Sequence, residues 1–152
     1  MKCRTGVLTL IAVIILSCSS KGKEFEKHNR LAQMYASSDS LEKAIEEWQL
    51  AIQADPNNKL SPAVINNIMN AKNKLNEQNE YNKAICQKNM SAIESAACIG
   101  YAQNAIAGDA RYPTKNEIIS SGIIDEFPKC PSGGTYKYDS KEGIVQCSIH
   151  NR

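Results

Sequence analysis

The sequence predicts an α+β fold with a helical N-terminal part and a mixed C-terminal part. Apolar and small residues recur at three- and four-residue steps through residues 24–58, and again from about 80 to 107. Residues 135–138 and 144–149 alternate between apolar and polar side chains around a turn that ends in glycine, a pattern typical of a β-hairpin. We therefore expect an N-terminal helical hairpin, followed by a long helix that packs on a small antiparallel sheet.

The first residues have the composition of an export signal. Lys2 and Arg4 precede an apolar run from Val7 to Leu16. This run is shorter than the roughly 20 apolar residues that a helix needs to cross a bilayer. We therefore predict that residues 1–17 are a signal peptide, with a short buried helix as the alternative.

The end of this run carries a cleavage and lipidation pattern. Ile15-Leu16-Ser17-Cys18 resembles the lipobox of bacterial lipoproteins, in which a peptidase cuts before the cysteine. The resemblance implies a diacylglycerol and palmitate on Cys18, which would anchor the chain because stable anchoring needs more than one acyl chain. We expect residues 18–23 to form a flexible tether. Ser19 indicates sorting to the outer membrane, facing the periplasm.

The charge balance excludes some classes of function. The chain has 18 basic and 16 acidic residues, and Lys2 and Arg4 would leave with the signal peptide. A neutral body without a basic cluster gives no electrostatic footprint for nucleic acid. The sequence also lacks a phosphate-binding loop and a nucleophile motif, so we expect no enzyme, no small-molecule substrate and no cofactor.

Residues 24–58 have small and large side chains at positions that suit two closely packed helices. Alanines let the helices approach each other, and an aromatic residue from each helix fills the groove between them. With Pro56 as the terminal proline, the segment resembles one tetratricopeptide repeat, a helical hairpin of about 34 residues. An ordinary amphipathic hairpin is the alternative. The predicted packing residues are Leu31, Ala32, Tyr35, Ala44, Trp48, Ala51 and Pro56.

The boundaries of this hairpin also follow from the sequence. Asp39 and Glu42 have the spacing of a capping box at the start of the second helix, and Pro56 ends that helix. The stretch from 61 to 80 is helical in character and would cap the hairpin. These elements make residues 24–79 the predicted helical domain.

A single repeat cannot bury its own face, since usually three are needed. The hairpin must therefore dock on the rest of the chain or on a protein partner. We expect a membrane-anchored adaptor that binds a protein, with a contact surface near Gln33, Tyr35, Glu47 and Gln49.

The C-terminal part begins with the long helix over about 80–107. Thr114 and Glu117 then form a second predicted capping box, for a short helix that ends near Gly122. The order of elements and five motifs resemble the C-terminal part of prepilin-type proteins, the pseudopilin-like family of type II secretion. The motifs are Cys86–Ile93, Tyr112–Thr114, Gly122–Ile124, Cys130–Tyr136 and Cys147–His150.

This resemblance implies a helix packed on a small antiparallel sheet in residues 80–152. Prepilins have an apolar stem before this helix, whereas residues 61–79 are polar here. We therefore transfer the fold and not filament assembly. A structural accessory of a type II secretion or type IV pilus-like apparatus is the alternative function.

The four cysteines after Cys18 favour disulfide chemistry in an exported protein. Cys86 and Cys98 are twelve residues apart, or about 18 Å along one helix, so they cannot pair with each other. A Cys130–Cys147 disulfide would close the hairpin and stabilise the fold by on the order of 3 kcal/mol. In that case we expect Cys86 and Cys98 to remain as small buried apolar side chains. The alternative pairs each helix cysteine with one hairpin cysteine.

Zinc binding is a further alternative for these residues. Cys130, Cys147 and His150, with Cys86 or Cys98, make a possible tetrahedral set. A Cys-x-x-Cys doublet is absent and an exported chain lies in an oxidising compartment, so we predict no metal. A cysteine nucleophile paired with His28 or His150 is weaker still, because neither histidine lies in a catalytic motif.

Overall fold

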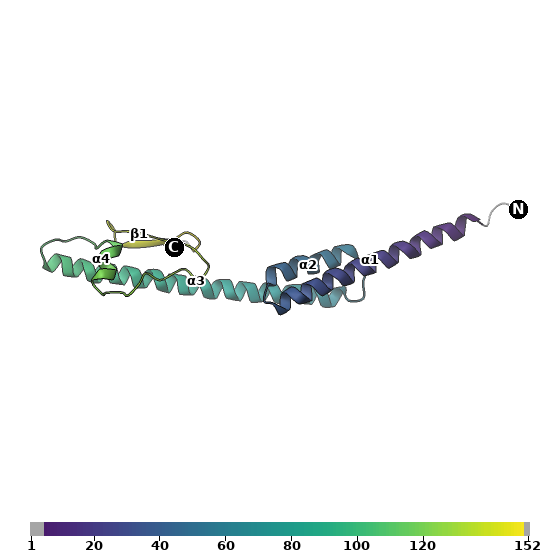
Figure 1. Cartoon of the computed structure of the whole chain (residues 1–152), viewed down its shortest axis with the longest axis horizontal. Coiled ribbons are helices and arrows are strands. Elements are labelled where there is room, and N and C mark those ends of the chain that lie inside the picture. The colour runs from purple at the N-terminus through teal and green to yellow at the C-terminus, as the bar shows by residue number, and fades with distance from the viewer. Residues whose placement is uncertain (1–4, 151–152) are drawn as a thin grey trace. The chain divides into compact units, whose positions relative to one another are not determined.

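The structure is a computed structural model that describes the backbone of residues 5–150 and the side chains of residues 20–150. Its elements confirm the predicted α+β fold class (Figure 1). The chain divides into two compact units, Met1–Asn76 (unit 1) and Glu77–Arg152 (unit 2). In chain order the elements are α1 (Thr5–Ser37), α2 (Leu41–Ala54), α3 (Ser61–Ile106), α4 (Lys115–Ser120), β1 (Tyr136–Asp139) and β2 (Ile144–Cys147).

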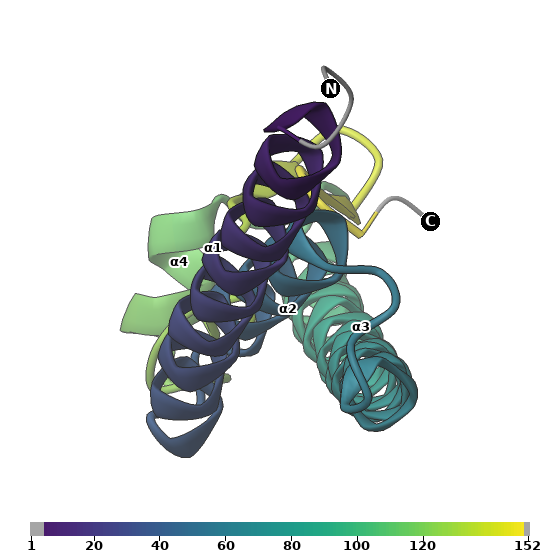
Figure 2. The same cartoon turned by 90° about the vertical axis from the view of Figure 1, so that its right-hand side faces the viewer.

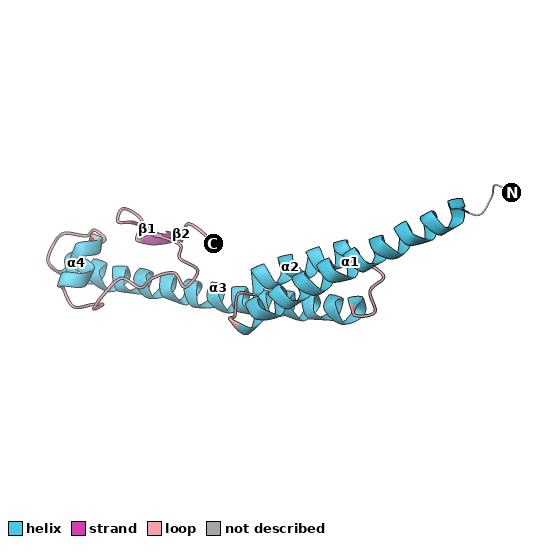
Figure 3. Ribbon diagram, turned by 45° about the vertical axis from the view of Figure 1, so that its right-hand side comes forward, coloured by secondary structure: helices cyan, strands magenta, loops and turns pink. Residues whose placement is uncertain are grey.

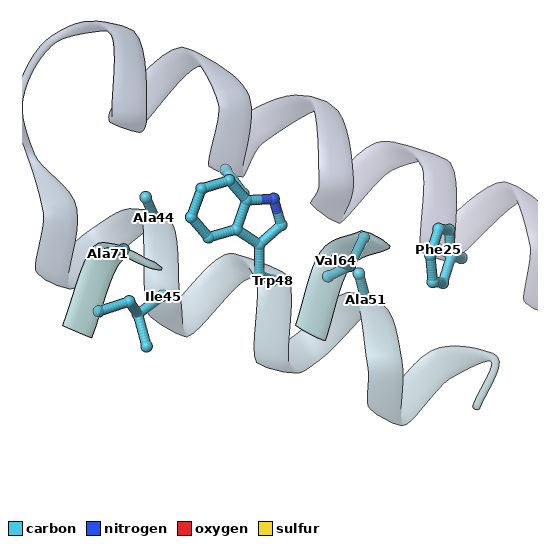
Figure 4. Close-up of a cluster of buried hydrophobic side chains, with 8 residues drawn as sticks. Phe25, Ala44, Ile45, Trp48, Ala51, Val64 and Ala71 are labelled. Carbon is cyan, nitrogen blue, oxygen red and sulfur yellow. The ribbon is translucent and has the colours of Figure 1, made fainter. Parts of the chain in front are cut away.

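Unit 1 is built from α1, α2 and the first part of α3. The helices α1 and α2 form a hairpin joined by a short turn (Figure 2). Trp48 projects from α2 toward α1, and the small side chains of Ala44 and Ala51 flank it (Figure 4). From α3, Val64 and Ala71 join this core. The alanines bring the helix backbones close together, and the indole fills the remaining space.

The predicted capping box at the start of α2 is wrong. The N-cap is Ser40, and no side chain caps the helix there. Asp39 instead has a left-handed backbone, with φ of 58°, and its carboxylate accepts a hydrogen bond from Lys74 of α3 at 2.8 Å. Because Leu41 is the first helical residue, Glu42 lies one position too early for a capping box.

Two helices are longer than we predicted. Residues 20–23, which we expected in a flexible tether, belong to α1. Phe25 is fully buried one turn later and holds this part of α1 on the core. The two helices that we expected over 61–80 and 80–107 are one element, α3. Neither proline nor glycine occurs between Pro62 and Gly100, so the sequence supplies no helix breaker there.

Unit 2 consists of the later part of α3, the short helix α4 and the antiparallel pair β1 and β2 (Figure 3). Tyr136 pairs with Cys147 across the sheet. Met90 and Ile93 of α3 pack against Val145 of β2, whereas Ala97 of α3 packs with Ile118 of α4. One face of α3 therefore carries both the sheet and the short helix.

The predicted helix cap and turn glycines of unit 2 are present in the structure. Thr114 and Glu117 form the predicted capping box of α4, and Gly122 has φ of 71° just after that helix. Gly143, with the same φ, closes the β1–β2 turn where an added Cβ would overlap the ring of Tyr112. The two turns require glycine because of their positive φ, and the start of α4 requires a capping side chain. The sequence provides both.

Candidate functional site

The predicted packing residues of the helical repeat gather in and around the core of unit 1. Ala32, Ala44, Trp48 and Ala51 are buried. Tyr35 is partly buried against them. The other two lie outside this core: Leu31 is half-buried on α1, and Pro56 is exposed beyond the end of α2.

A polar pair joins α1 to α2. It involves His28, which stands at the position where a tetratricopeptide repeat usually has its first aromatic residue. His28 Nδ1 lies 2.7 Å from a carboxylate oxygen of Glu47. Glu47 is therefore engaged inside the hairpin, and Tyr35 packs on the core. Of the predicted contact surface, Gln33 and Gln49 are exposed, whereas Tyr35 and Glu47 are half-buried, and the surface stays a prediction.

A different surface of unit 1 offers a binding groove. It runs along α1, beside Leu31 and Met34, and Met34 is 64% exposed. The sequence does not distinguish this strip, because apolar residues at helical spacing also occur in ordinary cores. Its lining residues are Lys23, Glu26, Lys27, Arg30, Leu31 and Met34.

The lipobox cysteine, Cys18, lies outside the described side chains. Its predicted lipidation therefore stays a prediction. Among the described residues, no helix is long and apolar enough to cross a membrane.

Unit 2 contains a cluster of three cysteines and one histidine, here called the thiol–imidazole cluster: Cys86, Cys130, Cys147 and His150. Cys86 comes from α3, Cys130 from the loop before β1, and Cys147 from the end of β2. Their ligand atoms all lie within 4.8 Å of one another. The three cysteines are buried, and His150 is half-buried.

The imidazole lies between the sulfurs and a serine. His150 Nδ1 is 3.3 Å from Cys130 Sγ and 4.0 Å from Cys147 Sγ. The other ring nitrogen, Nε2, is 3.4 Å from the hydroxyl of Ser132. The ring therefore points Nδ1 at the thiols.

Hydrogen-bond donors also point at the sulfurs. The Tyr136 hydroxyl donates to Cys86 Sγ at 3.3 Å, and the backbone N–H of Ile149 donates to Cys147 Sγ at 3.5 Å. Gly134 lies against the same sulfurs, because a Cβ at this position would be 2.9 Å from Cys147 Sγ. The local chain thus leaves room for sulfur atoms and directs donors toward them.

The environments of the thiols differ. Burial raises the pKa of the Cys86 thiol to about 11, although the hydrogen bond from Tyr136 opposes the rise. Burial also opposes ionisation of Cys147, but hydrogen bonds from the backbone of His150 and Ile149 outweigh it and lower the pKa of Cys147 to about 6.

Cys98 lies apart from this cluster and is exposed, so our expectation of a buried Cys98 is wrong. Cys86 is buried, as expected. Cys130 and Cys147 are close to each other but are free thiols in this structure, and their disulfide stays a prediction. The sequence leaves open whether Cys86 or Cys98 joins Cys130, Cys147 and His150, and the structure places Cys86 beside them.

Comparisons with protein-family models, with curated proteins and with solved structures find no match to this chain. The lipoprotein, tetratricopeptide and prepilin resemblances therefore stay predictions from the sequence.

Proposed function

We propose that the protein is an outer-membrane lipoprotein, anchored through Cys18 and facing the periplasm, that acts as a non-enzymatic adaptor for a protein partner. The observation that supports binding is the groove along α1. Leu31 and Met34 supply its apolar floor. Three basic side chains and one acidic side chain border it, so the border carries a net positive charge: Lys23, Lys27, Arg30 and Glu26. An apolar strip with a basic border suits an amphipathic segment that carries acidic residues.

Site-specific crosslinking in the native membrane tests the groove. A photoreactive residue replaces Met34 in the full-length chain, and a matched control replaces Leu50 of α2, which is 41% exposed. We expect one defined protein adduct from position 34 and none from position 50. Adducts of equal yield from both positions, or none from either, would contradict the adaptor function.

Lipidation is tested independently. We expect the wild-type chain to incorporate labelled palmitate and to remain in the membrane fraction. Cys18→Ser should lose the label and enter the soluble fraction, because the lipid supplies the anchoring free energy. A Cys18→Ser variant that still fractionates with membranes would contradict this anchor.

The alternative function, an accessory of a type II secretion or pilus-like apparatus, is supported by a different surface. Ile99 and Ile106 are seven residues apart on α3, so they lie on one face, and they are 51% and 89% exposed. A photoreactive residue at Ile106 that captures a pseudopilin, with no adduct from Met34, would favour this function over the adaptor.

A further inference from the structure

We propose that Cys86, Cys130, Cys147 and His150 of unit 2 form a structural zinc site. This site goes beyond the adaptor function and departs from our expectation of no metal.

The separations between the ligand atoms suit one zinc ion. Zinc in a closed site takes four ligands at tetrahedral corners, with Zn–S near 2.3 Å and Zn–N near 2.0 Å, so neighbouring ligand atoms are about 3.5–3.8 Å apart. His150 Nδ1 lies 3.3 Å from Cys130 Sγ and 4.0 Å from Cys147 Sγ. All four ligand atoms lie within 4.8 Å of one another. Small side-chain adjustments suffice to place them around one ion.

One zinc ion would use all four groups of the cluster. A Cys130–Cys147 disulfide would use two sulfurs, and Cys86 would then serve only as a buried packing residue. Cys86 is fully buried, and it comes from α3, far in sequence from the other three. Coordination of one zinc ion uses all four groups and fills the usual ligand number for a closed site.

The groups around the ligands also suit a metal site. Histidine ligands commonly use the second ring nitrogen in a hydrogen bond that fixes the tautomer. The contact between His150 Nε2 and Ser132 has this arrangement. The donors from Tyr136 and Ile149 would stabilise thiolate sulfurs. Gly134 keeps the space beside Cys130 and Cys147 free of a side chain.

The choice of zinc follows from the ligand set. Thiolates suit zinc, copper(I) and iron–sulfur clusters, and imidazole suits zinc among other metals. Three sulfurs and one nitrogen with no open position match the closed structural sites of zinc. Such an ion would tie α3 to the β-hairpin and to the segment after it, so its binding free energy would contribute to folding.

The metal content of the full-length protein tests the proposal. The chain is extracted in detergent, and zinc is measured by mass spectrometry in the wild type, in His150→Ala and in the matched control Cys98→Ser. We expect one zinc per chain in the wild type and in Cys98→Ser, and almost none in His150→Ala. Copper or iron in place of zinc would overturn the proposal, as would equal zinc in all three proteins.

A second measurement distinguishes the loss of a metal site from the failure of a variant to fold. Co²⁺ is added to the reduced, metal-free wild type, where we expect the absorption bands of tetrahedral cobalt with thiolate ligands. Ser132→Ala should retain these bands and bind about tenfold more weakly, since it removes an outer-shell partner. A metal-free protein with a Cys130–Cys147 disulfide that, once reduced, gives no cobalt bands would overturn the zinc site.

Discussion

Unit 1 and unit 2 both use α3, but different groups fill their cores. In unit 1, alanines and one tryptophan pack three helices without any sulfur. In unit 2, Met90, Ile93 and Val145 pack beside three cysteines, and the sheet has only two short strands. Unit 1 obtains its stability from close apolar packing, whereas unit 2 has a small sheet and a group of sulfurs at the point where its segments meet. Small folds commonly need such a covalent or metal link.

The largest effect should come from the tryptophan of unit 1. Trp48→Ala removes a side chain that is 5% exposed, and we expect a loss of about 3–5 kcal/mol in the free energy of unfolding. Chemical denaturation of the full-length chain measures it. The cobalt spectrum of unit 2 should not change; a changed spectrum would contradict the independence of the two cores.

Substitution of Gly134, beside the cysteines of unit 2, should have the next largest effect on stability. In Gly134→Ala the new Cβ would meet Cys147 Sγ at 2.9 Å and Cys130 Sγ at 3.2 Å. We expect a loss of about 1–3 kcal/mol, as in other overpacked sites, together with weaker cobalt binding. The matched control is Gly22→Ala on α1, where a Cβ meets nothing within 4 Å. It should stabilise unit 1 by about 0.5–1 kcal/mol. Equal destabilisation by both variants would argue against a crowded site at Gly134.

Loss of the His28–Glu47 pair of unit 1 should lower the free energy of unfolding by a smaller amount. His28→Ala removes the partner of Glu47, whose oxygen lies 2.7 Å from Nδ1. We expect a loss of about 1 kcal/mol in the free energy of unfolding, typical of one hydrogen bond. Denaturation of Gln33→Ala, an exposed position on the same helix, provides the control. A loss in His28→Ala no larger than in this control would show that the pair does not stabilise the hairpin.

The smallest effect concerns acid sensitivity in unit 2. Hydrogen bonds from Arg111 and from the backbone of Thr114 hold the pKa of Glu117 well below its ordinary value of about 4.5. A lowered pKa in the folded state means that the stabilisation is present above the ordinary value and is lost as pH falls below it.

The Glu117→Gln variant should therefore reduce the loss of stability of unit 2 below about pH 4.5. Thermal unfolding followed across that range measures the effect. Glu126→Gln, at another exposed carboxylate of unit 2, should retain the wild-type profile. If Glu117→Gln and Glu126→Gln give the same dependence of stability on pH, the lowered pKa of Glu117 does not cause the acid sensitivity of unit 2.

Local features of the chain were predictable where local interactions decide them. The capping box of Thr114 and Glu117 formed because both partners lie within one helical turn. At Asp39 the same kind of pattern failed, because Asp39 has a left-handed backbone and Ser40 is the N-cap, which places Glu42 one position too early. Residue spacing also did not predict that Tyr35 packs on the core or that Glu47 pairs with His28, and the contact surface near them stays a prediction.

The sequence alone determined the α+β class, the packing alanines around Trp48 and the turn glycines, because periodicity and backbone conformation are local properties. It also named the four groups of the thiol–imidazole cluster, but with Cys86 and Cys98 as equal candidates. Only the tertiary structure chose Cys86, since the packing of α3 against the β-hairpin determines which face of the helix meets Cys130, Cys147 and His150. Cys98, twelve residues further along α3, is exposed apart from the cluster, and residue spacing cannot show which cysteine the sheet will cover.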